Sequence, residues 1–295
     1  MVEFVIGVDG GGSGTRAWVA RPSGPVLGRG DAGPSALGQG IGQAWQNIEH
    51  AVRAAFDDAD VAWPGWPRCG AVCALSGVSN PAWRDAFLAA DRGLALLDAE
   101  TDAFAMLVGA HGGRPGAIVA AGTGSVGEVL RPDGTRTTVG GWGFPIGDEG
   151  SGAWLGLQAV RYAQAVLDGR ERGAALAQHV LARCGSHRDA LQAWCDTAGQ
   201  FAYAQLARAV FEYEAVDPRA AALLREAVSA LECIAHALDP QGALPVAFAG
   251  SVAHRLAPRV APALRARWVE PAEGPAAGAL ALARRLVQEE LMSAN

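Results

Sequence analysis

The stretch Val8-Asp9-Gly10-Gly11-Gly12-Ser13-Gly14-Thr15-Arg16 follows the apolar run Phe4-Val5-Ile6-Gly7 near the start of the chain. A β-branched run that is broken by an acidic residue and glycines indicates a strand entering a tight turn. The apolar segment Ala17-Trp18-Val19-Ala20 that follows predicts a returning strand. The opening of the chain is therefore expected to form a β-hairpin with a glycine-rich turn.

This turn has the composition of an anion-binding loop. Glycines let the backbone approach a ligand closely, and successive free N–H groups in a turn form a cradle for an anion. Asp9, at the strand end, is able to hold a hydrated Mg²⁺. The turn matches neither the Walker pattern nor the GxGxxG-then-helix fingerprint, because no Gly-Lys-Ser/Thr follows it and the next segment resembles a strand. An ordinary glycine-rich hairpin is an equal alternative on this stretch alone. The candidate phosphate-binding residues are Gly11, Gly12, Ser13, Gly14 and Thr15.

A second strand and glycine turn lies in the middle of the chain. The buried-strand pattern of residues 117–121 is followed by Gly122-Thr123-Gly124-Ser125 and by the strand-like residues 126–130. The same order of strand, glycine turn and hydroxyls predicts an internal repeat of two related halves, each with a phosphate loop. A further short strand over residues 244–249 ends at Gly250-Ser251.

The predicted domain boundary is the segment 109–116, which contains four glycines and a proline. We therefore expect an N-terminal domain over residues 1–112 and a C-terminal domain over residues 113–295. The tail over residues 274–291 has a helical pattern, and this helix is free to pack back on the first domain. Residues 157–238 are also helical in pattern, with many Ala, Leu and Arg residues.

Composition excludes several classes of protein. The 295 residues are enough for two domains, and the formal charge of -6 argues against a nucleic-acid partner and against an anionic-membrane partner. The chain contains no lysine, so a phosphate site must use backbone N–H groups, hydroxyls, arginine or a metal ion. The five cysteines show no CxxC spacing and are typical of reduced thiols in a cytoplasmic protein.

Acidic residues at two places are candidates for chemistry. Asp102 follows the strand predicted over residues 94–97, and a carboxylate there could orient and deprotonate a hydroxyl nucleophile. It could equally be the N-cap of the helix that begins near Ala103. Asp148 and Glu149, in the glycine-rich loop over residues 140–156, are suited to accept hydrogen bonds from hydroxyl groups, or to cap the helix that follows.

Two aromatic residues of the same loop, Trp142 and Trp154, are expected to pack in the interior, because buried aromatic residues outnumber those that contact ligands.

Six motifs together carry a resemblance to a known family. They are Asp9–Thr15 (DGGGSGT), Leu75–Gly77 (LSG), Thr101–Ala103 (TDA), Ala121–Ser125 (AGTGS), Gly140–Gly156 (GGWGFPIGDEGSGAWLG) and Ala249–Ser251 (AGS). The chain resembles the N-acetylglucosamine kinase and glucosamine kinase group of the BadF/BadG/BcrA/BcrD ATPase family, within the actin/hexokinase-like superfamily. The resemblance implies an α/β fold in which two ribonuclease-H-like (actin/hexokinase-type) domains flank a nucleotide and sugar cleft.

The resemblance also implies an activity and roles for residues. The expected reaction is transfer of the γ-phosphate of ATP, with Mg²⁺, to the 6-hydroxyl of N-acetylglucosamine or glucosamine. Asp102 would be the general base, and Asp9 would hold Mg²⁺ through water. The two phosphate loops would be Asp9–Thr15 and Gly122–Ser125, and Gly250 and Ser251 would lie against the adenosine. The sugar would be lined by Ser76, Gly77, Asp102, Thr123, Gly141, Asp148 and Glu149.

One departure bears on the substrate. Relatives that hold an N-acetyl group often carry an asparagine after a Gly-Pro-Ala-like turn, where this chain has Pro34-Ser35-Ala36-Leu37. This difference favours free glucosamine. The oligomeric state stays open, and a homodimer is one alternative.

Two other functions are alternatives. One is a family ATPase that activates a 2-hydroxyacyl-CoA dehydratase, but the cysteine that such proteins carry just before the AGTG turn is absent here, where Val119 and Ala120 stand. The other is a non-enzymatic sugar-sensing regulator, which would need an N-terminal helix-turn-helix that this sequence does not show.

Overall fold

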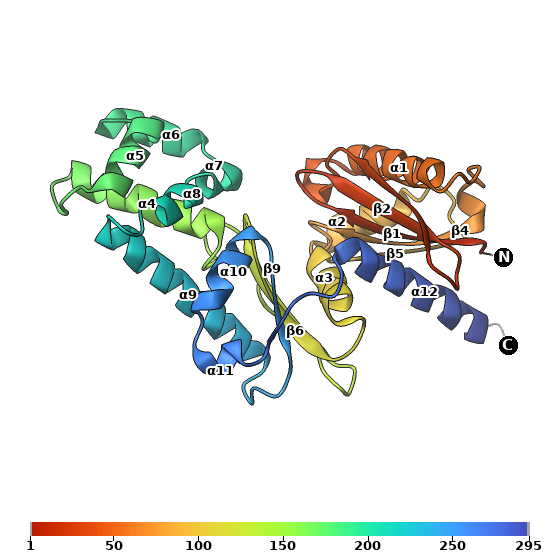
Figure 1. Cartoon of the computed structure of the whole chain (residues 1–295). Helices are drawn as coiled ribbons and strands as arrows, with labels where there is room; N and C mark the ends of the chain where they lie inside the picture. Colours follow the sequence, from red (N-terminus) through yellow and green to blue (C-terminus); the bar gives the residue numbers. More distant parts are fainter. Residues whose placement is uncertain (1, 294–295) are drawn as a thin grey trace. The chain divides into compact units, whose positions relative to one another are not determined.

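The computed structural model describes residues 2–293. The chain divides into two compact units, each with its own sheet (Figure 1). The first unit contains the residues up to Pro115 together with those from Pro271 onward, and the second contains Gly116–Glu270. The C-terminal helix is therefore part of the first unit.

The first unit is built on a five-stranded sheet in the order β3-β2-β1-β4-β5. The first three strands pair antiparallel, whereas β4 and β5 run parallel to β1. Its elements are β1 (Phe4–Gly10), β2 (Thr15–Ala20), β3 (Val26–Ala32), a 3₁₀ turn (Leu37–Gln39), α1 (Ile41–Asp58), a second 3₁₀ turn (Trp66–Arg68), β4 (Cys69–Leu75), α2 (Pro81–Ala89), β5 (Leu96–Glu100), α3 (Asp102–His111) and α12 (Pro275–Ser293).

The second unit repeats this topology. Its five-stranded sheet has the order β10-β9-β6-β7-β8, with β6, β7 and β8 antiparallel and with β9 and β10 parallel to β6. The internal repeat expected from the two glycine turns is thus confirmed. The elements are β6 (Gly116–Ala121), β7 (Ser125–Leu130), β8 (Arg136–Gly140), α4 (Gly152–Leu167), α5 (Ala175–Cys184), α6 (Arg188–Thr197), α7 (Gln200–Ala204), α8 (Ala207–Glu212), α9 (Pro218–Leu238), β9 (Val246–Ala249), α10 (Ser251–Leu256), a 3₁₀ turn (Ala257–Arg259), α11 (Pro262–Arg265) and β10 (Trp268–Val269).

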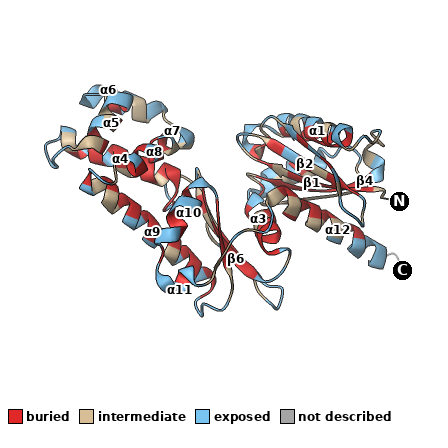
Figure 2. Ribbon diagram, viewed as in Figure 1, coloured by how far each residue is buried: buried red, intermediate tan, exposed pale blue. Residues whose placement is uncertain are grey.

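Helices cover both faces of the first sheet (Figure 2). Side chains alternate between the faces of a strand, and in β1 the residues Phe4, Ile6 and Val8 join the hydrophobic cluster that includes α1. Val5, on the other face, packs with Leu280 and Val287 of α12. The near-continuous apolar pattern of β1 is explained by this burial on both sides.

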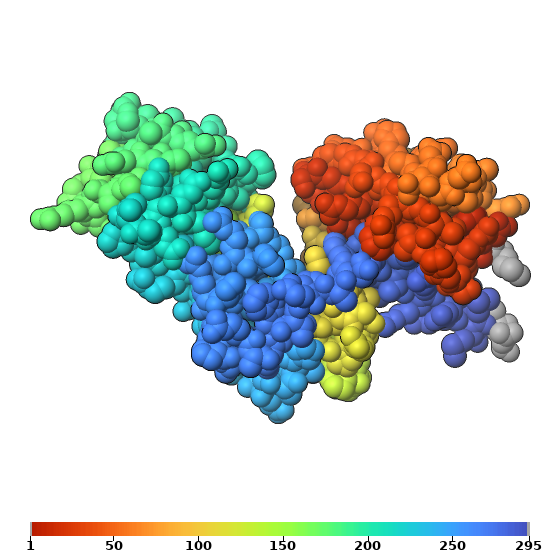
Figure 3. Space-filling view, viewed as in Figure 1, coloured from red at the N-terminus to blue at the C-terminus, as the bar shows by residue number. Residues whose placement is uncertain are grey.

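The first and last elements of the chain lie side by side in the first unit. In Figures 1 and 3, α12 runs against β1. The approach of α12 to α3 depends on Gly278, because a Cβ atom at this position would collide with the backbone carbonyl oxygen of Ala105. Small residues at this crossing therefore set the distance between the two helices.

The second unit has a larger helical part. The helix α9 packs on β6 and β7, where Ile234 and Leu238 lie against Gly127. The helices α4 to α8 share one hydrophobic cluster with this sheet. Among residues 2–293 no helix is both long and apolar enough to cross a bilayer.

Most elements occur where the sequence indicates them, and the exceptions are strands. Both expected hairpins form. The strand expected over 94–97 is shifted to Leu96–Glu100. The edge strands β3, β8 and β10 were not predicted, because their short or polar sequences become strands only by pairing with β2, β7 and β9.

Replacing Gly278 with alanine tests the packing of α12. Alanine favours the helical backbone by about 1 kcal/mol, but the Cβ must displace the backbone of α3, and such overpacking costs about 1–3 kcal/mol. We expect a lower free energy of unfolding in urea. Gly42→Ala, in α1 with open space around the new Cβ, is the matched control and should be neutral or stabilising. Equal stability of the two variants would contradict the close approach.

Candidate functional site

In both units the candidate residues follow the carboxyl ends of neighbouring parallel strands. In the first unit the 11–14 loop follows β1, Ser76-Gly77 follows β4, and Asp102 comes two residues after β5. In the second unit the 122–124 turn follows β6 and Gly250-Ser251 follows β9. Ligands of α/β sheets bind outside this edge, so each unit gathers its candidates in the place where the fold puts ligands.

The backbone of the first loop turns a carbonyl inward and N–H groups outward. The carbonyl oxygen of Gly11 accepts from the N–H groups of Ser35 (3.0 Å) and Ala36 (3.2 Å). A trans peptide directs its C=O and N–H in opposite directions, so the N–H of Gly12 points away from this segment. No group of the described residues accepts from the N–H of Gly12, Ser13 or Gly14.

The second loop shows the same arrangement. The carbonyl oxygens of Gly122 and Thr123 accept from the N–H groups of Gly152 (2.8 Å) and Ala153 (3.0 Å), the first residues of α4. The N–H groups of Thr123 and Gly124 consequently point away from α4, and within residues 2–293 neither has a protein acceptor. Each loop therefore presents consecutive free donors, as an anion-binding turn requires.

Each loop has one exposed and one buried hydroxyl. Thr15 is 1% exposed, and its hydroxyl contacts the carbonyl oxygen of Gly33 (2.6 Å) and the Ser35 hydroxyl (2.7 Å). The Ser125 hydroxyl donates to the carbonyl oxygen of Glu149 (2.8 Å). Thr15 and Ser125 fasten the loops from inside, because their hydroxyls are already used. Ser13 and Thr123 are exposed and available to a ligand.

Asp148 lies behind the second loop. It is 3% exposed, its φ is 65°, and its Oδ1 accepts from the N–H of Ser125 (3.1 Å). Its Oδ2 accepts from Nε2 of Gln200 at the start of α7 (2.7 Å). Gly124 has no room for a Cβ, which would lie 2.8 Å from Oδ1 of Asp148. The carboxylate expected to contact sugar therefore braces the loop in this structure, and its partner Gln200 lies outside every sequence motif.

Neighbouring residues perform the helix-capping roles that were alternatives for the acidic residues. The N-cap of α3 is Thr101, whose hydroxyl accepts from the N–H of Phe104 (3.1 Å). Asp102 is the first residue of the helix proper and reaches solvent. The N-cap of α4 is Ser151, whose side chain accepts from the N–H of Trp154. Capping therefore explains neither Asp102 nor Asp148 nor Glu149.

Asp9 and Asp102 both have raised pKa values, and the charge of Asp102 contributes to that of Asp9. Burial raises the pKa of Asp9 to about 6, Arg16 counteracts this rise, and the nearby charge of Asp102 adds to it. The distance from Arg16 Nη1 to Asp9 Oδ2 is 3.6 Å. Part of the Asp102 side chain reaches solvent, but desolvation by the protein around it also raises its pKa, against hydrogen bonds from the backbone N–H groups of Ala103 and of Asp102 itself. Both carboxyl groups therefore hold protons more tightly than exposed aspartates do.

This pair fits a hydrated Mg²⁺. Among residues 2–293 no group of three or more His, Cys, Asp or Glu side chains could hold a metal ion. Mg²⁺ usually keeps several waters and binds one or two carboxylates together with substrate phosphates. Asp9 next to the free N–H groups of the first loop has this chemistry, and a cation would relieve its repulsion with Asp102.

The remaining candidates border the loops. The N–H of Ser76 donates to the carbonyl oxygen of Gly10 (2.9 Å), and the N–H of Gly141 donates to that of Ser125 (3.1 Å). Gly250 lies against the backbone of residues 121–122. The side chains of Glu149 and Ser251 are exposed.

The two tryptophans differ from each other. Trp142 is 82% exposed, which corrects the expectation that it packs in the interior, whereas Trp154 packs against the hydrophobic cluster of the second unit.

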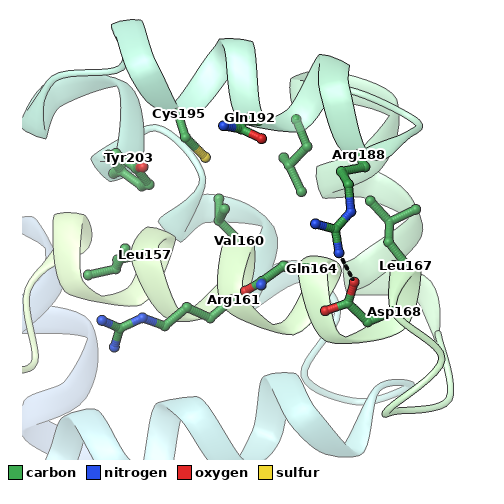
Figure 4. A pocket seen from close by; sticks show the side chains of 11 residues that line it. Leu157, Val160, Arg161, Gln164, Leu167, Asp168, Arg188, Gln192, Cys195 and Tyr203 are labelled. Atoms are coloured by element: carbon green, nitrogen blue, oxygen red, sulfur yellow. Dashed lines mark hydrogen bonds and ion pairs between the residues drawn. The ribbon is translucent and has the colours of Figure 1, made fainter.

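A cavity of about 320 Å³ lies elsewhere in the second unit, between α4 and α6 (Figure 4). The Arg188–Asp168 ion pair (3.0 Å) stands at one end, and Cys195 and Tyr203 stand at the other. None of the candidate residues lines it. The cavity is therefore separate from the strand-end site.

The sheets, their order and the strand-end loops define the two-domain ATPase fold of the actin/hexokinase type. The family model described as the BadF/BadG/BcrA/BcrD ATPase family matches residues 6–283. The chain belongs to this family.

Named relatives agree with this assignment. A glucosamine kinase of Vibrio cholerae is 30% identical over 283 residues, which cover 96% of each chain. A provisionally named N-acetylglucosamine kinase of Chromobacterium violaceum has a solved structure that is 44% identical, with a TM-score of 0.90, covering 96% of this chain and 99% of that one. A ROK hexokinase of Thermus thermophilus is 22% identical with a TM-score of 0.52, covers 97% of this chain and 99% of its own, and shows the fold alone.

The raised pKa of Asp9 predicts a pH dependence of stability. Its ordinary value is 3.8 and the folded value is about 6. The folded carboxyl binds its proton more tightly than the unfolded chain does, so this group stabilises the fold below about pH 4, and the contribution is lost as the pH rises through about 6. The contribution is at most about 3 kcal/mol. In the wild type, the free energy of unfolding in urea should therefore fall as the pH rises from about 4 through about 6. In Asp9→Asn this fall should be smaller.

The control for this experiment is Asp31→Asn. Asp31 is the exposed second partner of Arg16, at 3.8 Å. This variant should retain the wild-type change in stability with pH. Identical pH profiles for wild type and Asp9→Asn would contradict the assignment.

Proposed function

We propose that the protein is an ATP-dependent kinase that transfers the γ-phosphate to the 6-hydroxyl of an amino sugar, glucosamine or N-acetylglucosamine. The observation that carries the proposal is the pair of strand-end loops, at residues 11–14 and 122–124, whose unpaired N–H groups point outward. The family and the names of the relatives from Vibrio cholerae and Chromobacterium violaceum support the choice of acceptor.

The phosphates would be bound by backbone and hydroxyl groups. The chain has no lysine, and Arg16 lies beside Asp9 and Asp31. The donors are the N–H groups of the two loops with the exposed hydroxyls of Ser13 and Thr123, and Gly250 and Ser251 would lie against the adenosine. Asp9 would hold Mg²⁺ through water, and the ion, when bound, supplies charge neutralisation for the phosphates.

Asp102 would be the general base. Phosphoryl transfer depends mainly on positioning and on stabilisation of charge, and a carboxylate that accepts the proton of the attacking hydroxyl completes the set. Asp102 reaches solvent at the first residue of α3, follows β5 of the same edge, and has a raised pKa, which makes its carboxylate a better proton acceptor. The helix that begins with Asp102 is capped separately, by the Thr101 hydroxyl.

The sugar would contact groups around these loops. Ser76, Gly77, Thr123, Gly141 and Glu149 are the proposed lining residues, with Asp148 supporting Thr123 from behind through the N–H of Ser125. Ala36, where acetyl-binding relatives often have asparagine, donates its N–H to Gly11 and has no side-chain donor. We therefore propose that the 2-amino substituent is held loosely.

The substrate range tests the proposal. A coupled assay for ADP release should show sugar-dependent turnover with both glucosamine and N-acetylglucosamine, because no asparagine is present at position 36 to select the acetamide. A thousandfold preference for the acetylated sugar, about 4 kcal/mol, would show that another residue recognises the acetyl group. ADP release without sugar dependence would instead indicate a nucleotide-driven carrier and contradict kinase activity.

The role of Asp102 is tested by Asp102→Asn. The amide keeps the shape of the side chain but cannot accept the proton, and a positioned base contributes about 10²- to 10⁴-fold. We expect kcat to fall by a factor in this range, with thermal stability and ATP affinity near wild type.

The matched control is Thr101→Ala, which removes the cap. This variant should lose about 1 kcal/mol of stability while retaining most of its kcat. The opposite pattern, with a stable and active Asp102→Asn variant, would exclude Asp102 as the base.

A further inference from the structure

Gln200 belongs to no motif of the phosphate site, yet it contacts the group that braces one loop. It is the first residue of the five-residue helix α7, 52 positions after Asp148, and its Nε2 donates to Asp148 Oδ2 at 2.7 Å. The other oxygen of Asp148 accepts from the N–H of Ser125. A chain of contacts therefore runs from α7 through Asp148 to the end of the second loop.

This chain of contacts fastens the end of the loop that follows the free N–H groups, whose direction is set by the α4 contacts of Gly122 and Thr123. The N–H of Ser125 turns inward to Asp148, whereas those of Thr123 and Gly124 point outward. Gly124 lies in van der Waals contact with the Asp148 carboxylate and leaves no space for a side chain. A shift of this carboxylate would therefore move the peptide that carries the outward donors.

The two donors favour the ionised form of the Asp148 carboxyl group in its buried place. Burial raises the pKa of Asp148, the hydrogen bonds from Ser125 and Gln200 oppose this, and the charge of Glu149 adds to the rise. Hydrogen bonds to a charged group are worth more than those between neutral groups. Without Gln200, Oδ2 would lack the side-chain donor that the structure provides for it.

We infer that Gln200 is a positioning residue for nucleotide binding: through Asp148 it holds the 122–125 loop in the shape that presents the N–H groups of Thr123 and Gly124. This inference rests on the proposed function, because it assumes that the loop binds the phosphates of ATP. It assigns the start of α7, outside the sequence motifs, to the same site.

The test compares Gln200→Leu with Gln205→Leu. Gln205 lies five residues further along, is exposed, and has no side-chain partner in the described part of the chain, so it is a matched control. Loss of a hydrogen bond to a charged group predicts Mg·ATP binding weaker by roughly 10- to 100-fold in Gln200→Leu, measured by calorimetry. The KM for the amino sugar should change by less than that for ATP, and Gln205→Leu should bind as wild type does.

A second variant, Gln200→Glu, provides a readout that a merely structural role would not change. Two carboxyl groups in hydrogen-bond contact share one proton, and in the protonated state the introduced carboxyl can donate to Asp148. The ratio of variant to wild-type affinity for Mg·ATP should therefore approach one at acidic pH and fall as the pH rises. Asp9 and Asp102 are present in both proteins, so any effect of their titration on the affinity cancels when the ratio is taken at each pH. Glu149 is the other charged group beside Asp148.

Hydrogen exchange separates this inference from the proposed function. In Gln200→Leu the amides of residues 121–127 should exchange faster, while the rest of the second unit keeps its wild-type rates. Absence of sugar-dependent ADP release in the wild type would refute the kinase proposal and leave this exchange result standing. The inference is overturned by wild-type Mg·ATP affinity in Gln200→Leu, by an affinity ratio of Gln200→Glu that does not change with pH, or by faster exchange throughout the unit.

Discussion

The orientation of the peptide groups in two glycine loops is the constraint on which the site depends. Gly11, Gly122 and Thr123 give their carbonyl oxygens to protein donors, and the N–H groups that follow are thereby directed outward. In the second unit the donors are the first N–H groups of α4, which have no partner within their own helix. The helix end thus orients a loop whose outward N–H groups are suited to bind an anion.

Both units orient their loop peptides in this way, but different contacts hold each loop in place. Each loop follows the central strand of an equivalent sheet and has one buried hydroxyl that fastens it, Thr15 or Ser125. The first loop is anchored by the segment that contains Ser35. The second has an additional brace, Asp148, held by Gln200. A carboxylate exposed at the strand-end edge, Asp102, occurs beside the first loop. The repeat therefore combines a shared loop geometry with separate roles for each half.

Charge is the main difficulty for a phosphate site in this chain. The protein has a net charge of -6 and no lysine, and Asp9 and Asp102 lie close enough to raise the pKa of Asp9. The outward N–H groups would attract a phosphate without a lysine side chain. A hydrated Mg²⁺ at Asp9 would offset the negative charge of the two carboxylates. The acidic pair is unfavourable for the fold alone, which is typical of residues retained for function.

The sequence by itself determined the two hairpins, the strand-end loops and the place of Asp102, because apolar runs interrupted by glycine are local signals. It could not distinguish Thr15 from Ser13 or Ser125 from Thr123, since alternation along a strand does not say which hydroxyl finds a partner 20 or more residues away. It left the capping of α3 and α4 open, which Thr101 and Ser151 settle. The contact of Gln200 with Asp148, and the pairing of β3, β8 and β10, depend on segments brought together only by folding.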